Sequence, residues 1–146
     1  MKLTSHSPGE TVGVGLKLGG ILKAGSTVCL YGDLGAGKTT LIKGIGQAVG
    51  VPERDITSAS FTIVAEHDTD PPFYHIDLYR ITDDADLDST GVYDFIGGEG
   101  IAVIEWAEKI DIPEGCIAVR MNFLNNDSRE IIIEGIDEKN WDNMQA

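Results

Sequence analysis

A glycine-rich segment, YGDLGAGKTT at residues 31–40, has residue types and spacing that suit phosphate binding. It matches the pattern G-x-x-x-x-G-K-[ST] at every fixed position, and such loops cradle nucleotide phosphates. Gly35, Ala36 and Gly37 form the turn, where glycine allows consecutive backbone N–H groups to point inward at an anion. A chance match is the competing interpretation, but a buried-type strand precedes the loop and a helical pattern follows it. The context therefore favours a phosphate-binding loop.

Three side chains at the end of this loop have distinct expected roles. Lys38 can reach the β- and γ-phosphates during phosphoryl transfer, and the Thr39 hydroxyl can ligate Mg²⁺. Thr40 is placed to hydrogen-bond the α-phosphate. The helix that follows directs its positive N-terminal end at the same anion.

Besides the loop, a phosphate-binding site of this kind needs an acidic side chain at the end of a neighbouring strand to hold or orient magnesium. Glu105 follows the apolar run Ile101–Ile104, and Asp77 follows the run 73–76. Because the Glu105 strand is the more uniformly apolar, we assign Glu105 to the metal and Asp77 to polarising the attacking water or completing the metal shell. His75 should share a face with Asp77, and a lone histidine there is more often a structural hydrogen-bonding group than a catalyst.

The nucleotide and the reaction are narrowed by what the sequence lacks. It contains no Asn-Lys-x-Asp motif for guanine, which favours adenine. Its four arginines, Arg54, Arg80, Arg120 and Arg129, are widely spread, whereas a small-metabolite kinase needs an arginine-rich lid. If the strand after residue 73 continues through Arg80, that side chain faces away from Asp77. ATP hydrolysis is favoured, with a stand-alone kinase and a non-hydrolysing nucleotide sensor as alternatives.

The elements that must position these residues indicate one α/β domain over residues 1–146. The pattern predicts a P-loop NTPase-type three-layer fold, with a mostly parallel sheet and an added antiparallel hairpin. A helix should start at Ser7 and Pro8. Predicted strands cover 27–31, 60–67, 73–81 and 101–106, with a hairpin at 116–124 and 129–136. Short helices are expected around Leu87 and 92–96, and the acidic tail after Ile136 is either mobile or a final short helix.

Charge and composition limit the classes of partner. The 24 acidic and 11 basic residues give a net charge of −13, and wrapping nucleic acid requires clustered Lys and Arg. If nucleic acid is involved, a partner should hold it. Cys29 and Cys116 belong to no metal-spaced cluster, which favours buried, reduced thiols. With neither a signal-peptide pattern nor an 18-residue apolar run, the sequence predicts a cytosolic protein without membrane insertion.

Four blocks together resemble one family: YGDLGAGKTT, SASFTIVAEH, HIDLYRI and IEWAEKI, in this order and spacing. They are similar to TsaE, the small bacterial ATPase needed to make threonylcarbamoyladenosine in transfer RNA. The resemblance extends from about Thr11 to the final hairpin. It implies a P-loop fold, ATP bound with Mg²⁺, and feeble hydrolysis by the isolated protein. It also implies that TsaD and TsaB are the partners that carry out the transfer, with tRNA bound only through them.

The resemblance also assigns residues. Thr39 and Glu105 match the magnesium positions, and Asp77 matches the acid of the His-x-Asp-x-Tyr-Arg block. Trp106 matches the tryptophan after the glutamate, and Arg129 matches an arginine near the adenine. The segment 8–11 falls where the family approaches the nucleotide, although its residues match poorly. Residues 58–60 read Ser-Ala-Ser where the family usually has Ser-Pro-Thr.

Overall fold

The computed structural model describes residues 1–33, 35–56 and 63–144. All seven strands of this part belong to a single mixed sheet in the order β1-β7-β6-β2-β5-β4-β3. The strands are β1 (Lys2–Ser5), β2 (Thr27–Tyr31), β3 (Val64–His67), β4 (Phe73–Asp77), β5 (Ile101–Glu105), β6 (Ile117–Phe123) and β7 (Arg129–Glu134). The helices are α1 (Pro8–Gly19), α2 (Lys38–Val49), α3 (Asp84–Thr90) and α4 (Glu138–Asn143), with 3₁₀ turns η1 (Glu53–Asp55), η2 (Val92–Phe95) and η3 (Ala107–Lys109).

The centre of the sheet is parallel and both its edges are antiparallel. β2 pairs in parallel with β5 on one side and with β6 on the other, and β5 pairs in parallel with β4. β3 and β4 form an antiparallel pair, as do β6 and β7, and β1 adds antiparallel to β7. The predicted fold, a mostly parallel sheet with an added hairpin, is confirmed.

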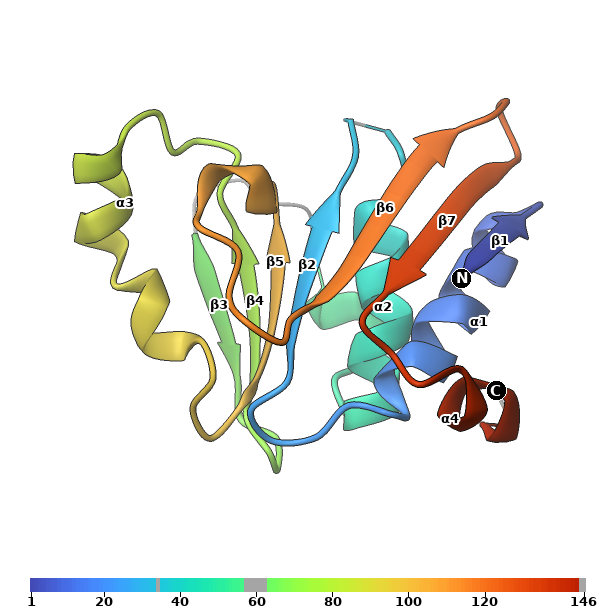
Figure 1. The fold of residues 1–146 in the computed structure, drawn as a ribbon, viewed down its shortest axis with the longest axis horizontal. Helices are drawn as coiled ribbons and strands as arrows, with labels where there is room; N and C mark the ends of the chain where they lie inside the picture. Colours follow the sequence, from blue (N-terminus) through green and yellow to red (C-terminus); the bar gives the residue numbers. More distant parts are fainter. Residues whose placement is uncertain (34, 57–62, 145–146) are drawn as a thin grey trace.

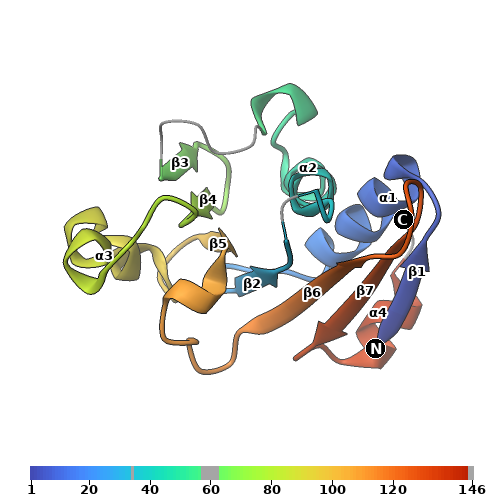
Figure 2. The same cartoon turned by 90° about the horizontal axis from the view of Figure 1, so that it is seen from above.

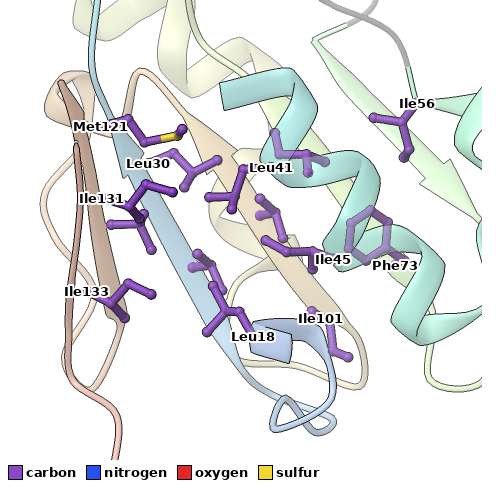
Figure 3. Packing of buried hydrophobic residues seen from close by; sticks show 14 of the residues in the cluster. Leu18, Leu30, Leu41, Ile45, Ile56, Phe73, Ile101, Met121, Ile131 and Ile133 are labelled. Carbon is purple, nitrogen blue, oxygen red and sulfur yellow. The ribbon is translucent and has the colours of Figure 1, made fainter. Parts of the chain in front are cut away.

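Helices α1 and α2 cover one face of the sheet, while α3, η2 and η3 cover part of the other (Figures 1 and 2). Under α1 and α2 the core contains alternate strand residues such as Leu30, Phe73 and Ile131, packed against Leu41 and others (Figure 3). The opposite strand positions pack against Leu87 of α3 and other residues of that side. The central strands β2 and β5 are buried on both faces, so each reads as an almost continuous apolar run.

Local signals explain where the two long helices begin and end. Ser7 caps α1 by accepting the Glu10 N–H at 3.1 Å, and Glu10 Oε2 accepts the His6 N–H at 2.6 Å. Helix α2 begins directly after Gly37 and ends at Gly50, whose φ of +100° is the left-handed conformation that glycine favours. Both helices lie where the sequence predicts them.

The structure corrects the predicted strand boundaries in two places. The strand predicted over 73–81 stops at Asp77, because the Asp77 side chain accepts the Tyr79 N–H at 2.9 Å and the chain turns. Arg80 therefore lies beyond the strand, and strand alternation does not turn its side chain away from Asp77. Strand β1, which the sequence analysis missed, lies at the sheet edge. The predicted strand over 60–67 is confirmed for 64–67, residue 63 precedes the strand, and residues 60–62 lie outside the described part of the chain.

The structure also tests the predictions for the short helices, the acidic tail and the cysteines. The short helices expected around Leu87 and 92–96 are present as α3 and η2, and the acidic tail forms the short helix α4. Cys29 and Cys116 carry free thiols as predicted, although Cys116 is only half-buried. Cys29 is fully buried, and this burial, with a smaller contribution from the neighbouring Cys116, raises the pKa of Cys29 to about 12. In the described part of the chain, no helix is long and apolar enough to cross a bilayer.

Candidate nucleotide-binding site

The glycine-rich loop connects the end of β2 to the start of α2, the strand–loop–helix context that a phosphate-binding loop requires. Gly37 has a φ of +99°, and Gly35 also has a positive φ. Gly32 is needed for a different reason: a Cβ at this position would lie 2.7 Å from the Met121 carbonyl oxygen. Leu34 lies outside the described residues. The glycines therefore allow both the turn of the loop and its close approach to β6.

Strand register brings the two predicted acids to the loop. Glu105 is paired with Leu30 of β2 on one side and with Asp77 of β4 on the other. Paired residues share a face of a sheet, and on this face Val103 and Phe73 pack with helix α2. Both acids are buried and lie on the face that carries α2. The strand bearing Glu105 is the direct neighbour of the loop strand, as its apolar sequence indicated.

Lys38 lies among these acids. Its Nζ donates to the Gly32 carbonyl oxygen at 2.5 Å and lies 3.6 Å from the centroid of the Trp106 ring. Burial lowers the pKa of the Lys38 ammonium, against the opposing attraction of Glu105, Glu108, Asp77 and Asp33. The structure thus brings together Lys38, Asp77 and Glu105. It holds the lysine charge at the site with contacts that a phosphate could replace.

Glu105 has a partner that the sequence analysis treated only as a structural histidine. His75 Nε2 and Glu105 Oε2 are 2.7 Å apart, and both residues are buried. The strand period placed His75 on the face of Asp77, and the register of β4 with β5 adds that this face is also that of Glu105. The signal in the sequence was therefore the His-x-Asp spacing, but the pairing of two strands was required to connect it to Glu105.

Two aromatic rings follow the two acids. The ring centroids of Tyr79 and Trp106 are 5.2 Å apart, at an interplanar angle of 47°. Trp106 has a φ of +59°, the only positive value at a non-glycine position in the described residues. Such a conformation is a true outlier for a bulky residue and often occurs where function requires it. The family resemblance implied no role for Trp106, and the structure places its ring against Lys38.

A small pocket lies on the other side of the loop. About 50 Å³ in volume, it is formed by the start of α1 (Pro8, Thr11), the loop and helix α2 (Gly37, Thr40) and the β6–β7 turn (Asp127, Arg129). Arg129 crosses it, since one terminal nitrogen (Nη2) donates to the Gly35 carbonyl oxygen at 3.1 Å and the other (Nη1) to the Asn125 carbonyl oxygen at 2.7 Å. The predicted residues Thr40 and Arg129 and the segment 8–11 therefore meet here.

The residues present fit a nucleotide with magnesium. Arg129 lines this pocket, and its Nε is among the buried donors of the described residues that have no hydrogen-bond partner. No group of three or more His, Cys, Asp and Glu side chains in the described ranges is arranged to hold a metal by itself. Magnesium bound through nucleotide phosphates requires only one or two protein ligands beside water. Thr39 and Glu105 would be sufficient. The Ser58–Ala59–Ser60 segment lies outside the described residues.

Comparisons with known proteins agree on one family. The family model described as "Threonylcarbamoyl adenosine biosynthesis protein TsaE" matches residues 5–131. A protein of Treponema pallidum named tRNA threonylcarbamoyladenosine biosynthesis protein TsaE is 35% identical over 135 residues, covering 91% of this chain and 99% of the relative. A Bacillus subtilis protein of the same name is 32% identical over 139 residues, covering 93% and 86%. The crystal structure of Bacillus subtilis YdiB superposes with a TM-score of 0.76 at 30% identity, covering 95% of this chain and 87% of that one.

Proposed function

We propose, from the premise that this chain belongs to the TsaE family of threonylcarbamoyl adenosine biosynthesis proteins, that it is a magnesium-dependent ATPase supporting TsaD and TsaB. The family places the chain in the biosynthesis of threonylcarbamoyladenosine in tRNA. One observation supports ATP hydrolysis most directly: Lys38, Asp77 and Glu105 converge at a glycine-rich loop between a parallel strand and a helix. The cytosolic location stays a prediction.

Each residue has a proposed task. Lys38 binds the terminal phosphates in place of its contacts with Gly32 and Trp106, and Thr39 and Glu105 hold the magnesium ion. Bound magnesium would neutralise the charge that develops on the phosphate oxygens. Asp77 orients the attacking water. The backbone N–H groups of residues 35–40 and the Thr40 hydroxyl bind the phosphates, and Arg129 packs on the adenine side.

We propose that the isolated chain hydrolyses ATP very slowly. Fast phosphoryl transfer commonly requires an arginine at the transferring phosphate, which can raise the rate by about 10³–10⁵ when a partner supplies it. Arg120 lies over the Tyr31 ring and Arg129 lies in the pocket beside the loop, while Arg80 is exposed in the turn after β4. TsaD with TsaB should accelerate turnover by contributing groups or by closing the site. Because the chain itself is strongly acidic, tRNA should reach the assembly through these partners.

The experiment is steady-state phosphate release by the chain alone, with TsaD, with TsaB and with both. We expect stimulation only with the partners, and we expect Lys38→Ala and Glu105→Ala to abolish it. Calorimetry should show that Lys38→Ala weakens ATP binding more than tenfold, because it removes a charge-assisted contact worth about 1.5–3 kcal/mol. Rapid turnover by the chain alone with an added small acceptor would identify a kinase. Tight ATP binding without hydrolysis, even with both partners, would identify a nucleotide sensor.

A further inference from the structure

We propose that His75 is a positioning residue that orients Glu105 for magnesium, an inference that rests on the proposed function. The observation is the contact of 2.7 Å between His75 Nε2 and Glu105 Oε2 in a buried part of the site. An imidazole Nε2–H donates to a carboxylate, and such charge-assisted bonds are short. The hydrogen bond engages one oxygen of Glu105 and leaves Oε1 for a ligand.

The register of the two strands explains why this histidine can act on this acid. β4 and β5 run in parallel, with His75 opposite Val103 and Asp77 opposite Glu105. His75 is therefore one step behind the acid pair on the same face of the sheet. It reaches Glu105 from within strand β4, while Lys38, the first residue of α2 after the loop, is the cation whose pKa Glu105 influences. A carboxylate held at one oxygen presents its other oxygen in a restricted direction.

Burial makes this bond necessary for orientation. His75 is 5% exposed and Glu105 is 3% exposed, so water cannot readily replace a missing partner on Oε2. Without the imidazole, the Glu105 side chain would rotate to satisfy that oxygen, and Oε1 would lose its defined position. Partners that orient a metal ligand in this way typically change metal affinity about 10- to 100-fold when they are removed.

The test uses the full chain with three variants of one position. His75→Gln keeps a donor, since the glutamine Nε2 lies the same number of bonds from Cα as the histidine Nε2. His75→Asn is polar but ends one atom short, and His75→Leu fills space without donating. ATP affinity is measured by calorimetry in EDTA and again across a magnesium titration, with the thermal midpoint of each variant recorded as the folding control.

We expect all three variants to bind ATP normally in EDTA. In His75→Leu and His75→Asn, the magnesium concentration that gives half of the increase in ATP affinity should rise about 10- to 100-fold. In His75→Gln this concentration should stay close to that of the parent. If His75→Leu fails to fold, the comparison of His75→Asn with His75→Gln still decides. Unchanged magnesium dependence in the variants that cannot donate would overturn the proposal, as would equal losses in all three.

A double-mutant cycle tests whether His75 acts through Glu105. In a Glu105→Gln background, adding His75→Asn should not weaken the effect of magnesium on ATP affinity any further. Additive effects of the two substitutions would overturn the positioning role. The same cycle separates this inference from the proposed function. If Glu105→Gln alone leaves magnesium dependence unchanged, the metal assignment of Glu105 fails, and the role of His75 fails with it. If Glu105→Gln removes the magnesium dependence of ATP binding and the His75 variants leave it unchanged, only the inference about His75 fails.

Discussion

At the residue scale, the two acids of the site differ in what their oxygens already do. Glu105 has one oxygen bonded to His75, while Asp77 Oδ1 accepts the backbone N–H of Tyr79 and so shapes the turn after β4. Asp77 therefore has a second, structural task that Glu105 does not have. A variant that keeps this acceptor is the proper test of its chemistry.

We predict that Glu105→Gln impairs magnesium-dependent ATP binding, while Asp77→Asn leaves binding within about threefold and lowers turnover with TsaD and TsaB by at least about 10²-fold, the scale of a lost general base. Asn keeps an oxygen for the Tyr79 N–H, so the turn should persist. Calorimetry and phosphate release on the same preparations measure both effects. Reversed phenotypes would exchange the two assignments and leave the site itself in place.

Arg129 provides a second prediction at this scale. Its Cζ lies 4.7 Å from the Phe123 ring centroid and its terminal nitrogens bond carbonyl oxygens on both the turn and the loop. We expect Arg129→Ala to weaken ATP binding about 10-fold, because a guanidinium that packs on a base and donates from a planar fork is lost. The ammonium of a lysine cannot reproduce that plane, so Arg129→Lys should recover little.

The control for Arg129 is the triphosphate without its base. Affinity for inorganic triphosphate should change less than affinity for ATP in Arg129→Ala, since triphosphate has no base on which the guanidinium can pack. Equal affinity of variant and parent for ATP would return Arg129 to the role of a hairpin surface charge.

How well the site could be predicted from sequence depends on the range of the signal. The loop residues Gly35 to Thr40 form one contiguous motif, so each was identified from its neighbours. Asp77 and Glu105 were found because acids that follow apolar runs meet at one sheet edge. The bond of His75 to Glu105 depends on the register of two strands 30 residues apart, and the contact of Trp106 with Lys38 depends on a left-handed backbone at a bulky residue. Neither contact can be predicted from the residues that are adjacent in the sequence.

At the element scale, α1 and α2 cross at two glycines. A Cβ added at Gly15 would lie 2.1 Å from the Leu41 carbonyl oxygen, and one added at Gly44 would lie 2.1 Å from the Val12 carbonyl oxygen. The backbones of the two helices are therefore in contact. In the sequence these glycines indicate only a poor helix former, because the contact that requires them is made with the other helix.

We predict that Gly15→Ala and Gly44→Ala each lower the free energy of unfolding by about 1–3 kcal/mol or more, the cost of overpacking. The matched control is Gly13→Ala in the same helix, where no atom lies within 4 Å of the added Cβ. It should raise stability by about 0.5–1 kcal/mol, because alanine is the better helix former. Urea unfolding measures all three. If Gly15→Ala is as stable as Gly13→Ala, the close crossing is wrong.

The boundaries of the strands also depend on contacts that local sequence does not reveal. Strand β4 was predicted four residues too long because Leu78, Tyr79 and Ile81 continue its apolar and aromatic composition, while the turn depends on the Asp77 side chain. Strand β1 was missed because it is short and lies at the edge, where only its pairing with β7 gives it a place. The central strands β2 and β5, which are buried on both faces, were predicted with bounds correct to within one residue.

At the scale of the whole molecule, the charge of −13 determines what the chain can bind alone. We predict no tRNA binding by the isolated chain at physiological salt, because no counterion release compensates the repulsion between an acidic protein and a polyanion. Mobility-shift titrations with the chain, with TsaD–TsaB, and with all three measure this. Salt-dependent retention of tRNA by the chain alone would contradict the prediction and would require a basic surface formed by few residues.

The packing of Trp106 on the Lys38 ammonium has an optical consequence. The chain contains two tryptophans, and the other, Trp141, is buried in α4 with Lys17 Nζ 4.7 Å from its ring centroid. In a Trp141→Phe background, Trp106 would be the only indole emitter, and its emission depends on the cation against its face. ATP that draws Lys38 onto its phosphates should therefore shift the fluorescence, with the same midpoint as calorimetry. The Trp141→Phe protein that also carries Lys38→Ala should show no such fluorescence shift. Constant emission of the Trp141→Phe protein at saturating ATP would mean that the lysine stays on the ring.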